Sequence, residues 1–288
     1  MSNIDIQHLQ TWQGRSEEHT DLISAFPSNA LSATLDRSDA PYQINDPLPP
    51  LWHWLHFLPL HKLKDSGYDG HAALGTFLPP VPLPRRMWAG SRLKFLAPMR
   101  IGKNLRKRSE VTRVSHKAGR SGDLVFVTLQ HDIWDDHTHC LSEEHDIVYR
   151  DLPTPQSRAK APPTAPERST FQRLITPDPV LLFRYSALTF NGHRIHYDHP
   201  FCVEKEGYEG LVVHGPLLAT LMLDLIRREL PSAVINTFEF RAIAPIFDTH
   251  PFSTHATINT DGTVSLWVRR HDGALAMDGT ATIGPQHD

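Results

Sequence analysis

Residues 212–225 read VVHGPLLATLMLDL, and a more polar stretch, FRYSALTFNGHRIHYD, precedes them at residues 183–198. A proline directly follows the glycine of the first stretch and suits the opening turn of a helix. Beyond it, apolar side chains recur on most of the helix circumference, and two arginines end the run where cations favour the helix dipole. The pattern predicts a buried helix over residues 216–229.

Strand-like alternation of apolar and polar residues follows this helix, over residues 234–240 and again over residues 264–268. The first half of the chain has similar alternation over residues 125–133. Upstream of that, LPPLWHWLHFLPL at residues 48–60 places apolar side chains at helical spacing after a proline and predicts a second helix. A helix with several antiparallel strands, occurring twice, predicts an α+β fold in which each sheet wraps round a helix.

The two halves are separated by RDLPTPQSRAKAPPTAPERST at residues 150–170. Its many prolines and its lack of large apolar side chains exclude a packed helix or a central strand. We therefore expect an N-terminal half at 1–150, a linker at 151–169 and a C-terminal half at 170–288.

Composition narrows the class of protein. The chain has 288 residues, 40% of them hydrophobic, and a formal net charge of −3 with both signs intermixed, so no basic stripe indicates nucleic acid. No secretory h-region opens the sequence, and no apolar run is long enough for a membrane span. The two cysteines, Cys140 and Cys202, favour a reduced, cytoplasmic protein without structural disulfides.

The motif at residues 183–198 and the start of the predicted helix carry the chemistry. His196 has the intrinsic pKa of a general acid/base, Asn191 can hold a water through its amide, and Gly192 permits a turn between them. Gly215 at the helix start offers an unobstructed backbone N–H for a developing oxyanion. Hydration of an enoyl thioester needs these elements. Each residue also has a purely structural interpretation: a hydrogen-bonded histidine, a tight turn and an ordinary helix start.

TFNGHRIHYD followed by GLVVHGPLLATLML resembles the (R)-specific enoyl-CoA hydratase motif of the MaoC-like hot-dog superfamily. Within that superfamily, the sequence of the motif is similar to the branch that contains 3-hydroxyacyl-thioester dehydratase type 2, mesaconyl-C4-CoA hydratase and bacterial itaconyl-CoA hydratase. DGHAALGTFLPPVPLPRRMWAGSRL at residues 69–93 resembles that branch as well. The resemblance implies a double hot-dog fold, a catalytic C-terminal half, a CoA thioester bound between the halves, and pairing into homo-oligomers. It implies no cofactor beyond the CoA of the substrate, and no metal.

Carried over from the family, the catalytic histidine is His196 and the oxyanion N–H belongs to Gly215. The generic motif has an aspartate where this chain has Asn191. Two consequences are open: His196 both takes and returns the proton, or a nearby carboxylate substitutes. Asp198 is the first candidate for that carboxylate, with a cap or turn role as the alternative.

A substrate with a free carboxylate requires a cation, preferably arginine. Five arginines lie in the two motifs, and Tyr185 and His214 complete the predicted substrate-binding set; the arginines are Arg184, Arg194, Arg85, Arg86 and Arg92. They favour a dicarboxylic acyl group, and our leading interpretation is a hydro-lyase interconverting itaconyl-CoA and citramalyl-CoA. Mesaconyl-C4-CoA hydratase and a 3-hydroxyacyl-thioester dehydratase of fatty acyl chains are the alternatives. Arg106, Lys107 and Arg108 are further candidates for the CoA phosphates.

Parts of the sequence also suggest three other classes of function. HDIWDDHTHC at residues 131–140 has metal-ligand residue types, but it lacks the paired spacing of known metal motifs and also fits two strands joined by a turn. FLPPVPLPRR at residues 77–86 suits a proline-rich docking ligand, although packing at a strand entry is the more economical interpretation. A non-catalytic acyl-CoA-binding protein is the third alternative, and the presence of His196 and Gly215 argues against it.

Overall fold

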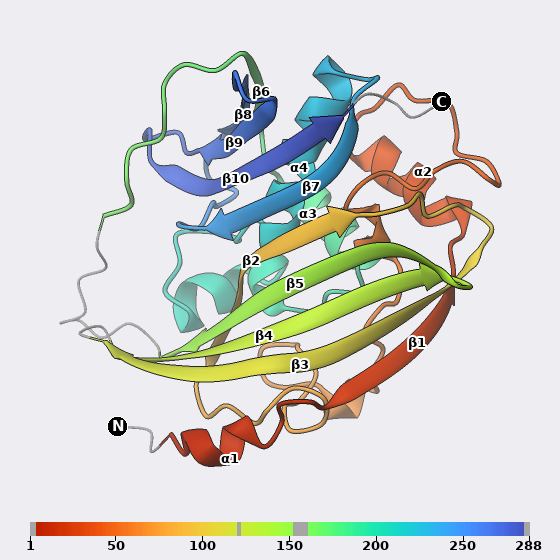
Figure 1. Ribbon diagram of the computed structural model, residues 1–288. Helices are drawn as coiled ribbons and strands as arrows, with labels where there is room; N and C mark the ends of the chain where they lie inside the picture. Colours follow the sequence, from red (N-terminus) through yellow and green to blue (C-terminus); the bar gives the residue numbers. More distant parts are fainter. Residues whose placement is uncertain (1–3, 120–121, 152–160, 285–288) are drawn as a thin grey trace.

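The computed structural model describes residues 4–119, 122–151 and 161–284, and its main feature is one ten-stranded antiparallel sheet (Figure 1). Across the sheet the strands follow the order β1-β3-β4-β5-β2-β7-β10-β9-β8-β6. Strands β1 to β5 come from the first half of the chain, and β6 to β10 come from the second. In chain order the strands are β1 (Ser16–Leu22), β2 (Arg85–Phe95), β3 (Asn104–Gly119), β4 (Gly122–Asp135), β5 (Thr138–Arg150), β6 (Phe171–Ile175), β7 (Val234–Ala242), β8 (Phe252–Ile258), β9 (Thr263–Arg269) and β10 (Leu275–Gly284).

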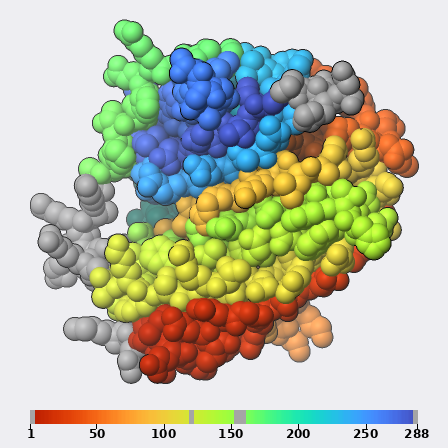
Figure 2. All heavy atoms as spheres, in the orientation of Figure 1, coloured from red at the N-terminus to blue at the C-terminus, as the bar shows by residue number. Residues whose placement is uncertain are grey.

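The two groups of strands join where β2 pairs with β7. Gly90 faces Arg241 at one end of this pairing, and Lys94 faces Thr237 at the other. A Cβ on Gly90 would lie 2.3 Å from the carbonyl oxygen of Phe240, so only glycine permits this approach of the two backbones. The result is one continuous sheet through both halves, which is visible in the ribbon and in the packed atoms (Figure 1, Figure 2).

Helix α4 (Gly215–Glu229) confirms the predicted buried helix. Every residue from Leu217 to Ile226 is buried, and the helix packs against β6, β8 and β9. Figure 1 shows α4 behind β7 and β10. Its one buried charge, Asp224, has a fully buried side chain that accepts hydrogen bonds from three arginines: Arg37, Arg173 and Arg228.

The predicted helix at residues 48–60 is wrong. Only one 3₁₀ turn, η1 (Trp52–Leu55), forms there, after Leu51 adopts a left-handed backbone with φ of 70°. The prolines on both sides supply no backbone N–H and prevent the turn from extending. Apolar spacing correctly identified side chains that enter the core, since Trp52 and Leu55 are buried, but it misassigned their backbone conformation.

The remaining helices lie in both halves of the protein, and α1 (Ile6–Gln10) packs against β3. Helix α2 (Ala25–Thr34) supplies the longer helix of the first half and contacts α3 (Pro179–Leu188). The shorter elements are α1 (Ile6–Gln10), the 3₁₀ turns η2 (Leu63–Asp65) and η3 (Arg194–His196), and the π-helical turn η4 (Phe201–Lys205). No helix among the described residues has the length and apolar character needed to cross a bilayer.

The proline-rich stretch at residues 77–86 packs into the protein. Val81 and Leu83 are buried in a core cluster formed with β3, β4 and β5, which agrees with the packing interpretation rather than a free docking ligand. Of the predicted linker, residues 152–160 lie outside the described residues. Its later part lies against the β9–β10 turn, where the Ala165 N–H donates to the Gly273 carbonyl. The strand predictions at 125–133, 234–240 and 264–268 are confirmed by β4, β7 and β9.

Candidate active site

The loop after α3 presents the predicted catalytic motif. The Asp178 carboxylate caps the start of α3 by accepting a hydrogen bond from the Leu181 N–H, and the helix ends at Leu188. The Asn191 N–H donates to the Ser186 carbonyl at 2.8 Å, which turns the chain back toward η3. The Asn191 side-chain oxygen accepts from the His193 N–H at 3.0 Å. Asn191 therefore shapes this turn, and its amide oxygen already has a donor.

His196 lies at the end of η3 in a buried position. Its Nδ1–H donates to the Val212 carbonyl at 2.7 Å, because a carbonyl oxygen can only accept. The other ring nitrogen, Nε2, is left with a lone pair. Burial lowers the pKa of His196 to about 4, although the hydrogen bond to Val212 acts in the opposite direction. At neutral pH the ring is thus an uncharged base whose accepting atom is Nε2.

His214, the residue directly before α4, packs against the ring of His196. The two imidazoles stack with centroids 3.6 Å apart and an interplanar angle of 18°. A 2.8 Å hydrogen bond joins His214 Nε2 to Ser186 Oγ, and the Tyr185 ring packs edge-on against His214. His214 is fully buried and Tyr185 is nearly so. His214 thus packs directly on His196, and Tyr185 packs on His214; substrate contacts of these two residues remain a prediction.

Gly215 begins α4 directly after His214. A Cβ built on Gly215 would meet no atom within 4 Å, so open space lies in front of the helix N-terminus. The first N–H groups of a helix have no intrahelical acceptor and carry the positive end of the dipole. The stacked ring of His196 lies against His214, the residue that precedes Gly215. This arrangement joins a base to an oxyanion donor.

A loop of the first half, which contains Asp69 and His71, packs against the loop of His193 and His196. The Arg194 N–H donates to the Asp69 carbonyl at 2.8 Å. The Asp69 carboxylate binds His71, whose ring stacks against that of His193 with centroids 4.0 Å apart. The functional prediction did not single out Asp69, His71 or His193. Asp69 and His71 lie in the stretch at residues 69–93 that resembles the family. The sequence does not show that this stretch contacts the loop of His193.

Asp198 is engaged in structure rather than in catalysis. One carboxylate oxygen pairs with the Arg194 guanidinium at 2.7 Å, and the other accepts from the Phe201 N–H. These contacts hold the pKa of Asp198 below its ordinary value. One oxygen thus caps the start of η4 while the other is held by Arg194, so the geometry supports the cap interpretation of Asp198.

The five predicted arginines have different environments. Arg85 forms a buried ion pair with Glu206, whereas Arg92 pairs with two carboxylates at the surface. Arg194 is paired with Asp198, and Arg184 is exposed on α3. Arg86, at the start of β2, is half-buried and forms no ion pair among the described residues. Burial is the main cause of the lowered pKa values of His71 and His193, and the charge of Arg86 lowers both further.

Other candidate groups from the sequence are occupied elsewhere. Arg106 pairs with Glu18, and Arg108 pairs with Glu110 at the surface. The metal-type residues at 131–140 bond to their own strands: His139 Nε2 contacts Asp132 and the Leu141 carbonyl. Among the described residues, the one group whose ligand atoms gather within 4.8 Å is Asp69, His71 and His193.

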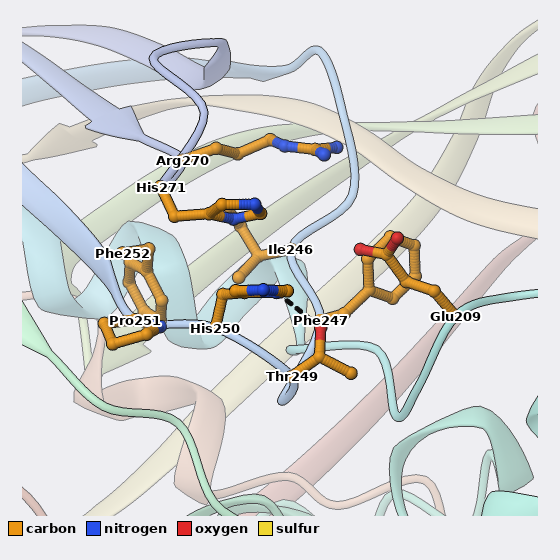
Figure 3. A pocket seen from close by; sticks show the side chains of 9 residues that line it. All are labelled: Glu209, Ile246, Phe247, Thr249, His250, Pro251, Phe252, Arg270 and His271. Carbon is orange, nitrogen blue, oxygen red and sulfur yellow. Dashed lines mark hydrogen bonds between the residues drawn. The ribbon is translucent and has the colours of Figure 1, made fainter.

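A separate surface hollow lies between the β7–β8 and β9–β10 loops (Figure 3). It carries a stacked pair of exposed histidines, His250 and His271, with ring centroids 3.8 Å apart. Arg270 at its rim pairs with Asp272. The hollow is lined mainly by loop residues and contains no helix start, so we place the candidate active site at His196 and Gly215.

The chain's relatives agree with this geometry. A family model described as hydroxyacyl-thioester dehydratase type 2 matches residues 51–248. The chain belongs to the hydroxyacyl-thioester dehydratase type 2 family. Within the curated proteins, it is 43% identical to the mesaconyl-C(4)-CoA hydratase of Chloroflexus aurantiacus, over 99% of this chain and 100% of the relative. It is 29% identical to the mitochondrial hydroxyacyl-thioester dehydratase type 2 of Schizosaccharomyces pombe, over 77% of this chain and 81% of the relative.

Solved structures show that this family member has the expected fold. A MaoC-like dehydratase from Phytophthora capsici superposes with a TM-score of 0.70 at 14% identity, covering 99% of this chain and 100% of that one. A Mycobacterium tuberculosis protein described as a double hot-dog fold gives a TM-score of 0.58 at 14% identity, covering 94% of this chain and 96% of that one. The predicted double hot-dog fold and the predicted branch of hydratases and dehydratases are confirmed. The acyl group is not tested by these similarities.

Proposed function

We propose that the protein is a hydro-lyase that adds water to the double bond of a short dicarboxylic enoyl-CoA. The observation that carries the proposal is that the neutral base His196 stacks on His214, the residue directly before Gly215 at the start of α4. Acid/base work and oxyanion stabilisation are the two contributions that this reaction requires of the protein. Family membership supports the class of enzyme.

The reaction follows from these two groups. The thioester oxygen accepts a hydrogen bond from the Gly215 N–H, and His196 Nε2 takes a proton from water as the water oxygen bonds to the β-carbon. Electrons of the double bond move to the thioester oxygen, where the helix dipole stabilises the enolate. When the enolate collapses, His196 returns the proton to the α-carbon. Dehydration of the 3-hydroxyacyl thioester is the same sequence reversed.

The proposed acyl groups are those of mesaconyl-C4-CoA and itaconyl-CoA, which both give citramalyl-CoA on hydration. The 43% identical relative supports mesaconyl-C4-CoA. Its double bond is conjugated with the thioester, so a single enolate is sufficient. Itaconyl-CoA, the substrate predicted from the sequence, has its double bond one carbon further away, so the bond must first move into conjugation. A fatty acyl thioester remains the alternative named by the yeast relative.

Arg86 is the group that we propose reads the free carboxylate of the substrate. Arg85, Arg92 and Arg194 are paired with carboxylates and Arg184 is exposed on α3. Arg86 is half-buried, and its charge lowers the pKa of His71 and of His193. A guanidinium can bind a carboxylate through two parallel hydrogen bonds. Crotonyl-CoA has no such carboxylate, which gives a direct comparison.

The test offers mesaconyl-C4-CoA, itaconyl-CoA and crotonyl-CoA in parallel and follows the hydrated CoA product of each by chromatography, together with the loss of enoyl-thioester absorbance for the two conjugated substrates. We expect the dicarboxylic substrates to be preferred, and Arg86→Gln to lower kcat/KM for them by about 10- to 100-fold with little change for crotonyl-CoA. Arg241→Gln, an exposed arginine on β7, is the matched control. Preference for crotonyl-CoA in the natural enzyme would refute the dicarboxylate assignment.

A second variant separates catalysis from binding. His196→Ala removes the base but leaves the Gly215 N–H and the space before it, so we expect CoA thioesters to bind while hydration falls by about 10²- to 10⁴-fold. Binding is measured by isothermal calorimetry with a saturated acyl-CoA. No turnover of any thioester by the natural protein, with binding retained, would leave a non-catalytic acyl-CoA-binding protein. A cytoplasmic location and a homo-oligomeric state remain predictions of the sequence.

A further inference from the structure

The loop that contains Asp69 is fixed on the catalytic loop by backbone contacts. The Arg194 N–H donates to the Asp69 carbonyl at 2.8 Å, and the Arg194 guanidinium donates to the Tyr68 carbonyl at 3.1 Å. A Cβ on Gly70 would lie 2.0 Å from the Gly192 carbonyl oxygen. The two loops thus approach more closely than any side chain would allow, and the first half has a defined position in a site of the second.

The Asp69 carboxylate is oriented toward the site by His71. One of its oxygens accepts from the His71 backbone N–H at 3.1 Å, and the other lies 2.9 Å from His71 Nδ1, which donates to it. The second oxygen is also 4.0 Å from His193 Nε2. The Asp69 side chain is 16% exposed, and that of His193 is 14% exposed. Their electrostatic attraction is therefore only weakly screened by solvent.

His193 lies between this carboxylate and the catalytic base. Its ring is stacked on His71 on one side and meets the His196 ring edge-to-face, with centroids 5.4 Å apart and an interplanar angle of 89°. The His193 backbone is held by the Asn191 side chain. Asp69, His71, His193 and His196 thus form one continuous line of ionisable groups from the first half to the second.

The charges along this line are well defined. Burial by itself would raise the pKa of Asp69, but hydrogen bonds and charge interactions with His71 lower it below its ordinary value, so the carboxylate is ionised. Burial is the main cause of the lowered pKa of His193 and also lowers the pKa of His71. The line contains one anion and neutral imidazoles. A neutral imidazole has one N–H and one lone pair, and the nearby carboxylate favours the tautomer whose N–H is directed at it.

We propose that Asp69 orients His193 as the second acceptor for the attacking water, and so supplies from the N-terminal half the carboxylate function that Asn191 lacks. With its Nε2–H directed at Asp69, His193 has its Nδ1 lone pair free for one water hydrogen. His196 Nε2 accepts the other. The proton on His196 is the one transferred to the α-carbon, whereas the hydrogen held by His193 stays in the product hydroxyl. Asp69 is a positioning residue here, because it acts through His193.

This inference rests on the proposed function, and its test begins from a natural enzyme with measured turnover. We expect Asp69→Asn to lower kcat by about 10- to 100-fold while KM and the melting temperature stay close to those of the natural enzyme. Asp65→Asn, which changes an exposed carboxylate of the same loop, is the matched control. If the natural enzyme hydrates its substrate and Asp69→Asn has the same kcat, the inference is overturned and the proposed function stands. If the natural protein hydrates no enoyl-CoA, the proposed function itself fails.

A rescue distinguishes positioning from a merely structural role. Asn191→Asp places a carboxylate where the generic motif has one, next to His193. We expect Asn191→Asp to restore most of the kcat lost in Asp69→Asn, so that the two changes are strongly non-additive in a double-mutant cycle. Purely additive effects would overturn the proposal. The proposal would also be overturned if a chelator abolished turnover and a divalent ion restored it. Asp69, His71 and His193 would then form a metal site.

Discussion

Buried neutral histidines should make the protein sensitive to acid well above the pKa of its carboxylates. Burial lowers the pKa to about 4 at each of three positions, His56, His145 and His196. In an unfolded chain the value is about 6.5. Between these two values the unfolded state binds protons that the folded state does not, so stability is lost as the pH falls from about 6.5 toward 4.

The size of the effect follows from linkage. Each histidine approaches a slope of about 1.4 kcal/mol per pH unit in the middle of this window, and acidification from pH 6.5 to 5 removes about 1.6 kcal/mol for each. Three such groups remove about 5 kcal/mol, which is comparable with the whole stability of many domains. His131, whose pKa burial lowers to about 3, acts in the same direction. We therefore expect unfolding to begin near pH 5 or above, before most carboxylates are protonated.

Urea unfolding at closely spaced pH values between about 4.5 and 8 measures this slope. His56→Gln removes one titrating group distant from the catalytic loop, so its stability should depend less steeply on pH, by about 1.4 kcal/mol per unit below pH 6. Lys64→Gln, an exposed change, should leave the slope unchanged. A stability that stays flat from pH 6.5 to 5, or a His56→Gln slope equal to that of the natural protein, would refute the reasoning.

Three further substitutions test single contacts. Gly215→Ala places a methyl group in the open space before α4, so kcat should fall by about 10²-fold while the melting temperature is unchanged; normal turnover would contradict the oxyanion role. Gly70→Ala drives a Cβ into the Gly192 carbonyl at a φ of +89°, and calorimetry should show a loss of at least about 1–3 kcal/mol together with lower kcat. Asp224→Asn leaves three arginines without their shared carboxylate, and urea unfolding should show a loss of about 3–5 kcal/mol, whereas equal stability would show that the cluster is dispensable.

The parts of the fold with regular periodicity were predictable from the sequence. Helix α4 and strands β4, β7 and β9 have apolar patterns that match their conformations. The backbone conformation of residues 48–60 was not predictable from the sequence. Apolar spacing there indicates which side chains are buried, but it does not indicate which backbone hydrogen bonds form. The polar side chains of this segment bond instead to Glu143, a buried carboxylate that accepts from His53 and Trp54. That acceptor is about ninety residues away in the chain and leaves no local pattern.

In the candidate site, too, local features were predictable from the sequence and contacts between distant segments were not. His196 and Gly215 were accessible because the motif and the helix start are local features. For Asp198 the sequence left two roles open, and the contacts with Arg194 and the Phe201 N–H support the cap role. Asp69 could not be assigned a role from spacing, since the contact with His193 joins two halves of the chain and depends on how the loops pack.

The pairing of β2 with β7 has a consequence for how the protein can be divided. Backbone hydrogen bonds hold the two halves together whatever connects them along the chain. A protease nick between residues 151 and 161 should therefore give two fragments that stay associated and active. The fragments could be exchanged between variants to assemble hybrid enzymes, with the acid/base histidine encoded on one piece and its carboxylate partner on the other.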